Sequence, residues 1–323
     1  MYCLVCPFSK TFDEVWVTYK VPDLLTSELK LWQIINIPLK NKNEIGIVIN
    51  ISKESNIDFD ESKIKEILSI KNEYIFLSSY RIELLKWIAK HYFTAIHNSF
   101  NLFLPRNLKE KIIKEKLKTE TIEKIKYNFD YNNDFSKSQS KAYKEIENSE
   151  NKKILLYGLT WSWKTEIYIN LIKKNLDNNK QSLFLIPEII LTNQLSDKIK
   201  KIFWDEVLIL NSTVTKATKT KNWLKINSNN AKIIIWTRSA LFYPYNDLWL
   251  IIIDEEHDNS YVSDSSPRYN AIEVAEKITE LNWNILILWS GTPSTNSMFK
   301  AVKWKYKLVS ILDKYNDNKK EDI

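Results

Sequence analysis

Residues 154–165 read Ile-Leu-Leu-Tyr-Gly-Leu-Thr-Trp-Ser-Trp-Lys-Thr, a short apolar run followed by a loop sequence. From Gly158 to Thr165 the loop matches G-x-x-x-x-G-K-[ST], except that Trp163 replaces the second glycine. In this motif successive backbone N–H groups face phosphates at the start of a helix. The stretch therefore predicts a strand, a phosphate-binding loop and a helix that runs from Thr165 to about Lys174.

The loop sequence predicts a first set of nucleotide-binding residues. Lys164 is expected to reach the β- and γ-phosphates of ATP, and the Thr165 hydroxyl to bind Mg²⁺. The remaining loop residues complete the phosphate site: Gly158, Thr160, Trp161, Ser162 and Trp163.

A second acidic motif lies downstream. Ile251 to Ile253 form an apolar run that ends in Asp254-Glu255-Glu256-His257. We expect Asp254 to hold Mg²⁺ and Glu255 to orient and deprotonate the attacking water. An acidic strand end alone is common, but together with the loop it predicts nucleotide hydrolysis.

Short apolar runs alternate with helical stretches from about residue 138 to 312. Runs that are apolar on both faces predict a parallel sheet covered by helices, hence an α/β domain. Ligands of such sheets bind at the carboxyl ends of strands, where both motifs fall. The runs are 154–157, 182–186, 207–210, 232–235, 250–253 and 285–288.

The first 105 residues have a different pattern, that of a small β-rich domain. Expected strands cover 1–8, 15–21, 33–39 and 45–51, and an expected helix covers 78–91. Residues 106–137 are charged and then polar, which predicts a linker with a solvated helix at 108–126. Residues 313–323 form a tail.

Composition excludes several classes. Cys3 and Cys6 cannot make a disulfide framework, and His91, His97 and His257 do not complete a zinc site, so a first strand is the simpler interpretation of 1–8. No apolar run approaches the ~20 residues needed to cross a bilayer, and no signal pattern is present, so a cytoplasmic protein is expected. The net charge of +7 permits a nucleic-acid partner.

Tryptophan and glycine usage is inverted. The chain has twelve tryptophans and three glycines, whereas ordinary usage near ~7% glycine would give more than twenty glycines. Several tryptophans fall at turns, where bulk is least welcome, so we interpret them as glycines of the living protein, encoded by UGA. The expected recoded positions are Trp16, Trp32, Trp161, Trp163, Trp204, Trp236, Trp249, Trp283, Trp289 and Trp304; Trp87 and Trp223 are expected to be genuine. The alternative is a degenerate loop in an inactive enzyme.

Five segments resemble the primosomal replication-restart DNA helicases of superfamily 2. Residues 158–168 resemble G-V-T-G-S-G-K-T-E-x-Y, and 185–192 resemble L-V-P-E-I-x-L-T. Residues 236–242 resemble G-T-R-S-A-L-F, 254–269 resemble D-E-E-H-x-x-S-Y followed by P-R-Y, and 288–294 resemble L-G-S-A-T-P-S. The resemblance extends to residues 1–105, which are similar to the family's N-terminal domain for the 3′ end of DNA.

The resemblance implies that the α/β domain is a RecA-like helicase lobe, and it implies further residue roles. Gln139 should lie near the adenine of ATP, and single-stranded or forked DNA should contact Arg238, Tyr261, Arg268 and Tyr269. His257, Ser290 and Thr292 should couple DNA binding to ATP hydrolysis. Primosome proteins and single-strand-binding proteins are the implied partners, and no membrane is involved.

Some features depart from the family pattern. Val262, Ser263, Asn270 and Ile272 differ from its usual residues, and the linker is short for its winged-helix domain. We expect the chain to be the N-terminal part of a 3′-to-5′ helicase and to be inactive alone. The family's second lobe, arginine finger and zinc-binding cysteines are not found in these residues, so no zinc site is expected here. Two alternatives stay open: a non-hydrolysing DNA-fork binding module, and another Asp-Glu-Glu-His translocase of repair or restriction, which residues 1–105 argue against.

Overall fold

The structure is a computed structural model, and it divides into two compact units, Met1–Lys118 and Thr119–Ile323. The boundary falls within the stretch expected to be a linker, but residues 105–134, including the expected helix at 108–126, lie outside the described part of the chain. The structure describes residues 1–8, 16–54, 61–71, 78–104, 135–158, 163–187, 194–203, 207–209 and 215–311, without the side chains of 163, 164 and a few other helical residues.

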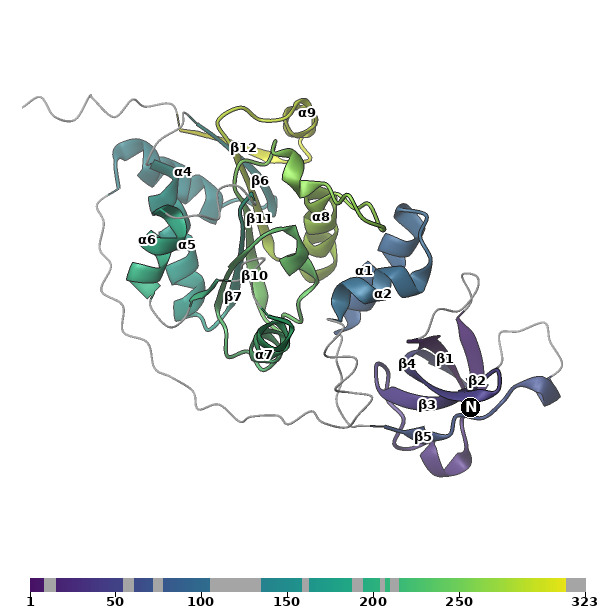
Figure 1. The fold of residues 1–323 in the computed structure, drawn as a ribbon. Helices are drawn as coiled ribbons and strands as arrows, with labels where there is room; N and C mark the ends of the chain where they lie inside the picture. The colour runs from purple at the N-terminus through teal and green to yellow at the C-terminus, as the bar shows by residue number, and fades with distance from the viewer. Residues whose placement is uncertain are drawn as a thin grey trace, which may run out of the picture. The chain divides into compact units, whose positions relative to one another are not determined.

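The first unit contains a five-stranded antiparallel sheet in the order β2-β1-β4-β3-β5 (Figure 1). The expected β-rich domain is confirmed. Gly46 lies where β4 crosses β1, and a Cβ there would come within 2.4 Å of Val5 Cγ1, so glycine allows the close pairing. The strands are β1 (Tyr2–Pro7), β2 (Val17–Lys20), β3 (Ile34–Leu39), β4 (Lys42–Ser52) and β5 (Ser69–Ile70).

The β1 cysteines are part of the core of this unit. Cys3 and Cys6 are buried and free, and burial raises the pKa of the Cys3 thiol to about 12. Two helices follow the sheet, α1 (Ser79–His91) and α2 (Ile96–Phe103). Leu84, Leu85 and Ile88 of α1 are buried, at the spacing of one helix face.

The second unit contains a seven-stranded sheet in the order β12-β6-β11-β10-β7-β9-β8, and every described pairing in it is parallel. The six expected strands are confirmed, and β12 is a seventh that the sequence pattern did not predict. The strands are β6 (Lys153–Gly158), β7 (Gln181–Leu185), β8 (Val207–Ile209), β9 (Ile233–Trp236), β10 (Leu248–Ile253), β11 (Ile285–Ser290) and β12 (Lys307–Ile311).

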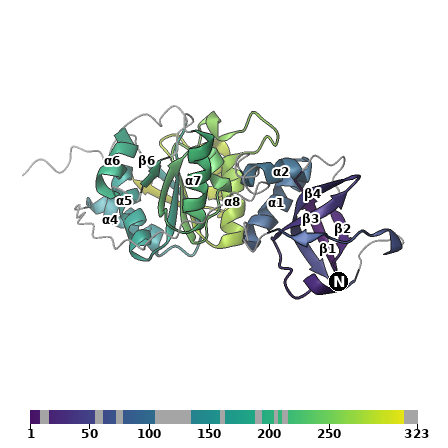
Figure 2. The same ribbon diagram turned by 60° about the horizontal axis from the view of Figure 1, so that its bottom comes forward.

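Helices cover both faces of this sheet (Figures 1 and 2). Helices α4, α5 and α6 lie on one face, and α7 and α8 on the other. Parallel neighbours need crossover connections, and these connections carry the helices that cover the sheet. The helices are α4 (Lys137–Glu147), α5 (Trp163–Asp177), α6 (Gln194–Phe203), α7 (Lys216–Asn227), α8 (Ala271–Asn282) and α9 (Thr295–Val302).

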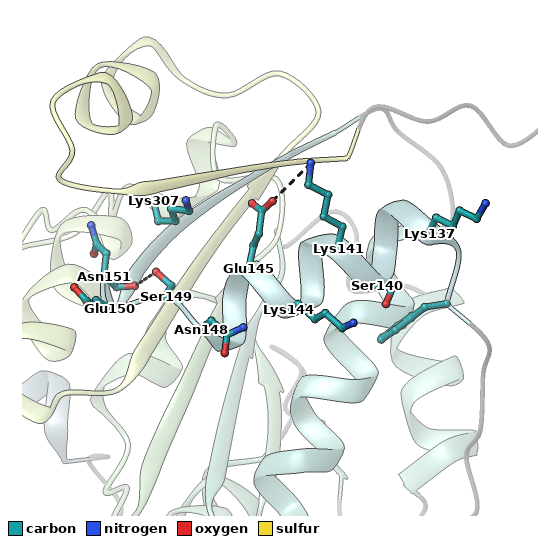
Figure 3. Close-up of a pocket in the computed structure, with 11 residues that line it drawn as sticks. Lys137, Ser140, Lys141, Lys144, Glu145, Asn148, Ser149, Glu150, Asn151 and Lys307 are labelled. Carbon is teal, nitrogen blue, oxygen red and sulfur yellow. Dashed lines mark hydrogen bonds and ion pairs between the residues drawn. The ribbon is translucent and has the colours of Figure 1, made fainter.

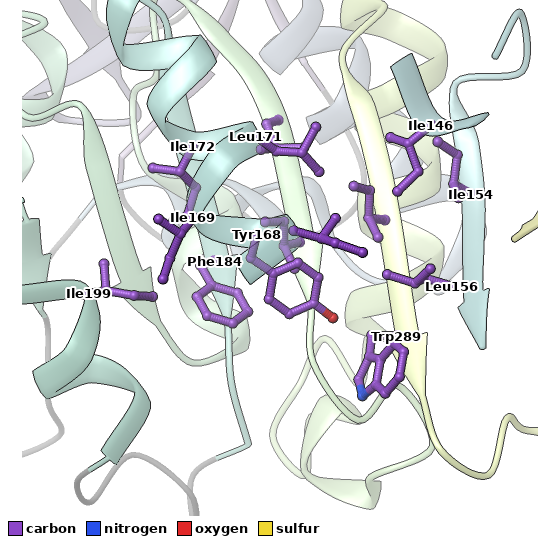
Figure 4. Close-up of a cluster of buried hydrophobic side chains, with 14 of the residues drawn as sticks. Ile146, Ile154, Leu156, Tyr168, Ile169, Leu171, Ile172, Phe184, Ile199 and Trp289 are labelled. Atoms are coloured by element: carbon purple, nitrogen blue, oxygen red, sulfur yellow. The ribbon is translucent and has the colours of Figure 1, made fainter. Parts of the chain in front are cut away.

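The main core lies between the sheet and α5 (Figure 4). Ile167, Tyr168, Ile169 and Ile172 are all completely buried there, because this apolar part of α5 meets strands that are apolar on both faces. The Tyr168 ring packs edge-on against Phe184 of β7, with ring centroids 5.4 Å apart. The helix that follows the phosphate loop is thereby fixed to the sheet.

Four helices of this unit end in a residue with positive φ. Two of these residues are Asn179 after α5 (φ 58°) and Asn229 after α7 (φ 61°), and asparagine adopts this conformation at modest cost. The other two are Trp283 after α8 (φ 57°) and Trp304 after α9 (φ 59°). Trp32 also has positive φ, at 73°. Glycine is the usual residue at such helix ends, so three of the expected recoded positions have the backbone conformation of glycine.

Candidate nucleotide and DNA site

The carboxyl edge of the central strands brings the predicted catalytic segments together. Strand β11 lies between β6 and β10, so Gly158 at the end of β6 and Asp254 after β10 flank the end of β11. A Cβ on Gly158 would lie 2.7 Å from the Ile311 carbonyl and 3.0 Å from Trp289 Cη2, so β12 and β11 leave room only for glycine. Close packing of strands thus explains the first glycine of the loop.

The loop itself is only partly described. Thr160, Trp161 and Ser162 lie outside the described residues, and for Trp163 and Lys164 only the backbone at the start of α5 is described. Thr165 is half-buried in the first turn of α5. The roles assigned to this loop stay predictions.

Asp254 and Glu255 differ in burial and backbone. Asp254 is 4% exposed, and its N–H donates to the Leu185 carbonyl at 3.0 Å. Glu255 is half-buried and has φ of 46°, in the left-handed region that is costly for a residue with a side chain. Such strain is concentrated at functional sites.

These donors suit magnesium. A carboxylate at Asp254 and a hydroxyl at Thr165 are hard oxygen ligands of the kind that Mg²⁺ prefers, bound together with phosphate oxygens. Among the described residues there is no group of three or more histidine, cysteine, aspartate or glutamate side chains arranged to hold a metal ion.

His257 links the acidic segment to the end of β11. Its Nδ1 lies 2.7 Å from Ser290 Oγ and 3.7 Å from Glu255 Oε2. Ser290 is completely buried, and its Oγ accepts the Thr292 N–H at 3.0 Å. The three residues predicted to couple the site are therefore joined by hydrogen bonds.

Glu256 is a link that the sequence did not predict. Its buried carboxylate accepts hydrogen bonds from the Ser294 N–H (2.6 Å), the Ser294 hydroxyl (3.1 Å) and the Ser297 hydroxyl (2.9 Å) at the start of α9. A carboxylate at a helix N-terminus is favoured by the helix dipole. Glu256 thus fixes α9 to the acidic segment, and no spacing in the sequence indicates this contact.

The two tyrosines that are predicted to stack on DNA bases are buried. Tyr261 is 1% exposed and Tyr269 is 4% exposed, so their ring faces are covered by protein. Base stacking by these two residues stays a prediction. Tyr269 packs edge-on against Phe242, with centroids 4.9 Å apart. Burial raises the pKa of Tyr261 well above its ordinary value, and the neighbouring carboxylates, Asp254 first, add to this.

The predicted cationic DNA contacts have different surroundings. Arg268 is exposed, whereas the half-buried Arg238 donates from Nη1 to the Ser260 carbonyl. The side-chain oxygen of Asp258 accepts the Ser260 N–H at 2.7 Å, and hydrogen bonding to Ser260 holds the pKa of Asp258 below its usual range. DNA contact by either arginine stays a prediction.

Gln139 is 3% exposed and belongs to the start of α4. Its Oε1 accepts the Ser136 N–H at 2.7 Å, while its own N–H donates to Ser136 Oγ, which completes a capping box. The structure therefore gives Gln139 a role in beginning the helix, and its proximity to adenine stays a prediction.

A hollow of about 890 Å³ lies along α4 and β12 (Figure 3). Its lining includes lysines 137, 141, 144 and 307 and two glutamates, one of which pairs with Lys141 at 4.0 Å. None of the four residues of the acidic motif lines this hollow.

Two protein-family models match separate parts of the chain. Residues 3–105 match the 3′ DNA-binding domain (3′BD), and residues 136–299, about half of the chain, match the DEAD/DEAH box helicase family. The chain therefore belongs to the DEAD/DEAH box helicases.

Among known proteins, the chain is similar to the replication restart protein PriA. It is 34% identical to that of Rickettsia felis over 97% of this chain and 46% of the relative, and 35% identical to that of Helicobacter pylori over 90% and 43%. It is 39% identical to that of Bacillus subtilis over 53% and 21%. The chain thus spans less than half the length of these relatives.

Similar solved structures include the Hef helicase domain of Pyrococcus furiosus, with 18% identity and a TM-score of 0.42, covering 55% of this chain and 38% of that one. A DEAD box protein of Methanococcus jannaschii has 20% identity and a TM-score of 0.40, covering 56% and 50%. The strand order described above defines the fold independently of these likenesses.

Proposed function

We propose that the chain supplies the DNA-end-binding domain and the first motor lobe of an ATP-dependent 3′-to-5′ DNA helicase that acts in replication restart at stalled forks. The observation that carries the proposal is the shared edge of β6, β11 and β10, where Gly158 ends β6, Ser290 ends β11 and Asp254 follows β10. In an open parallel sheet this edge is where ligands bind.

The chemistry follows from the residues at this edge. Lys164 would bind the terminal phosphates of ATP, while the Thr165 hydroxyl and the Asp254 carboxylate would hold Mg²⁺. When bound, the ion neutralises charge on the β- and γ-phosphates. Glu255 would accept a proton from the attacking water. The water oxygen would bond to the γ-phosphorus while the bond between that phosphorus and the bridging oxygen of ADP breaks.

The DNA partner is supported by the first unit. A 3′ DNA-binding domain matches residues 3–105, and we propose that it binds single-stranded or forked DNA. Primosome proteins and single-strand-binding proteins are proposed as partners on the basis of similarity to PriA alone. A cytoplasmic location is proposed for the same reason; within the described part of the chain, no helix is long and apolar enough to cross a membrane.

A non-hydrolysing DNA-binding module is the second candidate, and Trp163 is the residue that favours it. An indole at the second glycine of the loop would occupy space that the phosphate needs. If Trp161 and Trp163 are the encoded residues, the chain should bind DNA and not ATP.

ATP binding separates the two candidates. The chain as written should bind ATP weakly, and Trp161→Gly with Trp163→Gly should restore binding, as measured by calorimetry. Lys164→Ala in the glycine background should abolish binding again, because the charge facing the phosphates is removed. Equal affinity in all three proteins would place the site elsewhere.

A further inference from the structure

Tyr261 lies in the short helix η5 (Asn259–Tyr261), a few residues after the acidic strand end. Its hydroxyl donates to the backbone carbonyl of Asp254 at 2.5 Å and lies 3.2 Å from the carbonyl of Leu185. These carbonyls follow β10 and end β7, which are paired neighbours. One buried phenol therefore ties the Asp254 backbone to the adjacent strand.

The Asp254 carbonyl belongs to the peptide that joins Asp254 to Glu255. The orientation of this peptide sets φ of Glu255, which at 46° lies in the left-handed region. A side-chain-bearing residue persists in that region only where its surroundings impose it. The Tyr261 hydroxyl acts on the carbonyl of this same peptide.

Tyr261 is itself held from its other side. The preceding residue, Ser260, accepts a hydrogen bond from Arg238 at its carbonyl, and its N–H donates to Asp258 Oδ1 at 2.7 Å. The segment that carries the phenol is thus fixed by two side chains as well as by the burial of Tyr261.

We propose that Tyr261 is a positioning residue whose hydroxyl fixes the Asp254–Glu255 peptide and so aims the magnesium-binding and water-activating carboxylates. The proposal rests on the proposed function of this site. In this role Tyr261 acts through the backbone and touches neither nucleotide nor DNA.

The test is Tyr261→Phe in the full chain that carries Trp161→Gly and Trp163→Gly. The substitution keeps the ring and removes the hydroxyl. Tyr245→Phe is the matched control, because the Tyr245 hydroxyl is also buried and donates to a backbone carbonyl, that of Ala240, at 2.9 Å. ATP affinity is measured by calorimetry with Mg²⁺ and again with EDTA.

Tyr261→Phe should lower Mg-ATP affinity about tenfold, in the range for residues that orient metal ligands. Affinity for metal-free ATP should stay within about twofold of the Tyr245→Phe protein. Adding Tyr261→Phe to Asp254→Asn should cause no further loss, because both changes act on the same magnesium ligand.

Two results would overturn the positioning role of Tyr261 and leave the proposed function standing. One is a Mg-ATP affinity equal to that of Tyr245→Phe, and the other is an equal loss with and without Mg²⁺, which would indicate only general support of the fold. A glycine background that binds no ATP under either condition would instead overturn the proposed function, and this proposal with it.

Discussion

Replacing Trp283 by glycine should stabilise the helicase lobe, although it removes the largest side chain. Trp283 ends α8 with φ of 57° and ψ of 23°, and its N–H donates to the Thr279 carbonyl at 3.0 Å. This is the helix end at which glycine is usual. The side chain is 72% exposed, so little packing is lost with the indole.

The magnitude follows from two opposing terms. Relief of the left-handed backbone is worth roughly 1–2 kcal/mol, and the greater freedom of glycine in the unfolded chain costs about 0.4–1 kcal/mol. The net gain should be about 0.5–1 kcal/mol. Trp283→Asn should recover part of it and Trp283→Ala little, since only the first tolerates this conformation.

Urea unfolding followed by circular dichroism measures the effect without relying on tryptophan fluorescence. The midpoint should rise in the order Ala, Asn, Gly. Trp223→Gly is the control: Trp223 is 1% exposed within α7, and its loss should cost about 3–5 kcal/mol. A midpoint lowered by Trp283→Gly, or UGG codons at positions 283 and 304, would refute the glycine interpretation.

Two further predictions concern the site and the DNA partner. Glu256→Ala should lower the free energy of unfolding by about 2–3 kcal/mol, because three donors lose a buried charged acceptor. The control is Glu145→Ala, which removes a half-buried carboxylate that pairs only at 4.0 Å with Lys141 and should change the free energy by less than about 0.5 kcal/mol; equal losses in urea unfolding would contradict this. Residues 1–323 with glycine at 161 and 163 should bind DNA with an affinity that falls steeply with salt, yet not separate strands, because an arginine from a facing lobe is worth ~10³–10⁵ in rate; DNA-stimulated phosphate release and unwinding by this chain alone would disprove it.

Much of the fold was readable from the sequence because parallel strands buried on both faces are continuous apolar runs. The runs at 250–253 and 285–288 appear as neighbouring strands, β10 and β11. Strand β12 was missed because Lys307 and Ser310 interrupt its apolar pattern. It is an edge strand, which is buried less fully than the centre of the sheet.

Site residues were predictable where the backbone geometry requires one residue type. They were not predictable where only tertiary packing decides whether a side chain lies in the core or at the surface. Gly158 is required by the approach of β12, and the sequence identified it. Tyr261 and Tyr269 match a motif that the family resemblance assigns to DNA contact, but aromatic rings also fill protein cores. The sequence alone does not distinguish a DNA-contacting ring from a core ring. The sequence also does not show the environment of Trp289. This residue is buried beside Gly158, and its backbone does not have the positive φ that would favour glycine.

The four residues of the acidic motif have four different environments, and this explains how a short loop can connect several elements. Asp254 is tied by its backbone to β7 and Tyr261, while Glu255 carries the strained turn. Glu256 points back to α9, and His257 reaches Ser290 at the end of β11. We therefore expect a movement of α9, or of the segment after β11, to change the surroundings of Asp254 and Glu255, the predicted catalytic carboxylates, since packed elements shift between discrete arrangements and do not deform continuously.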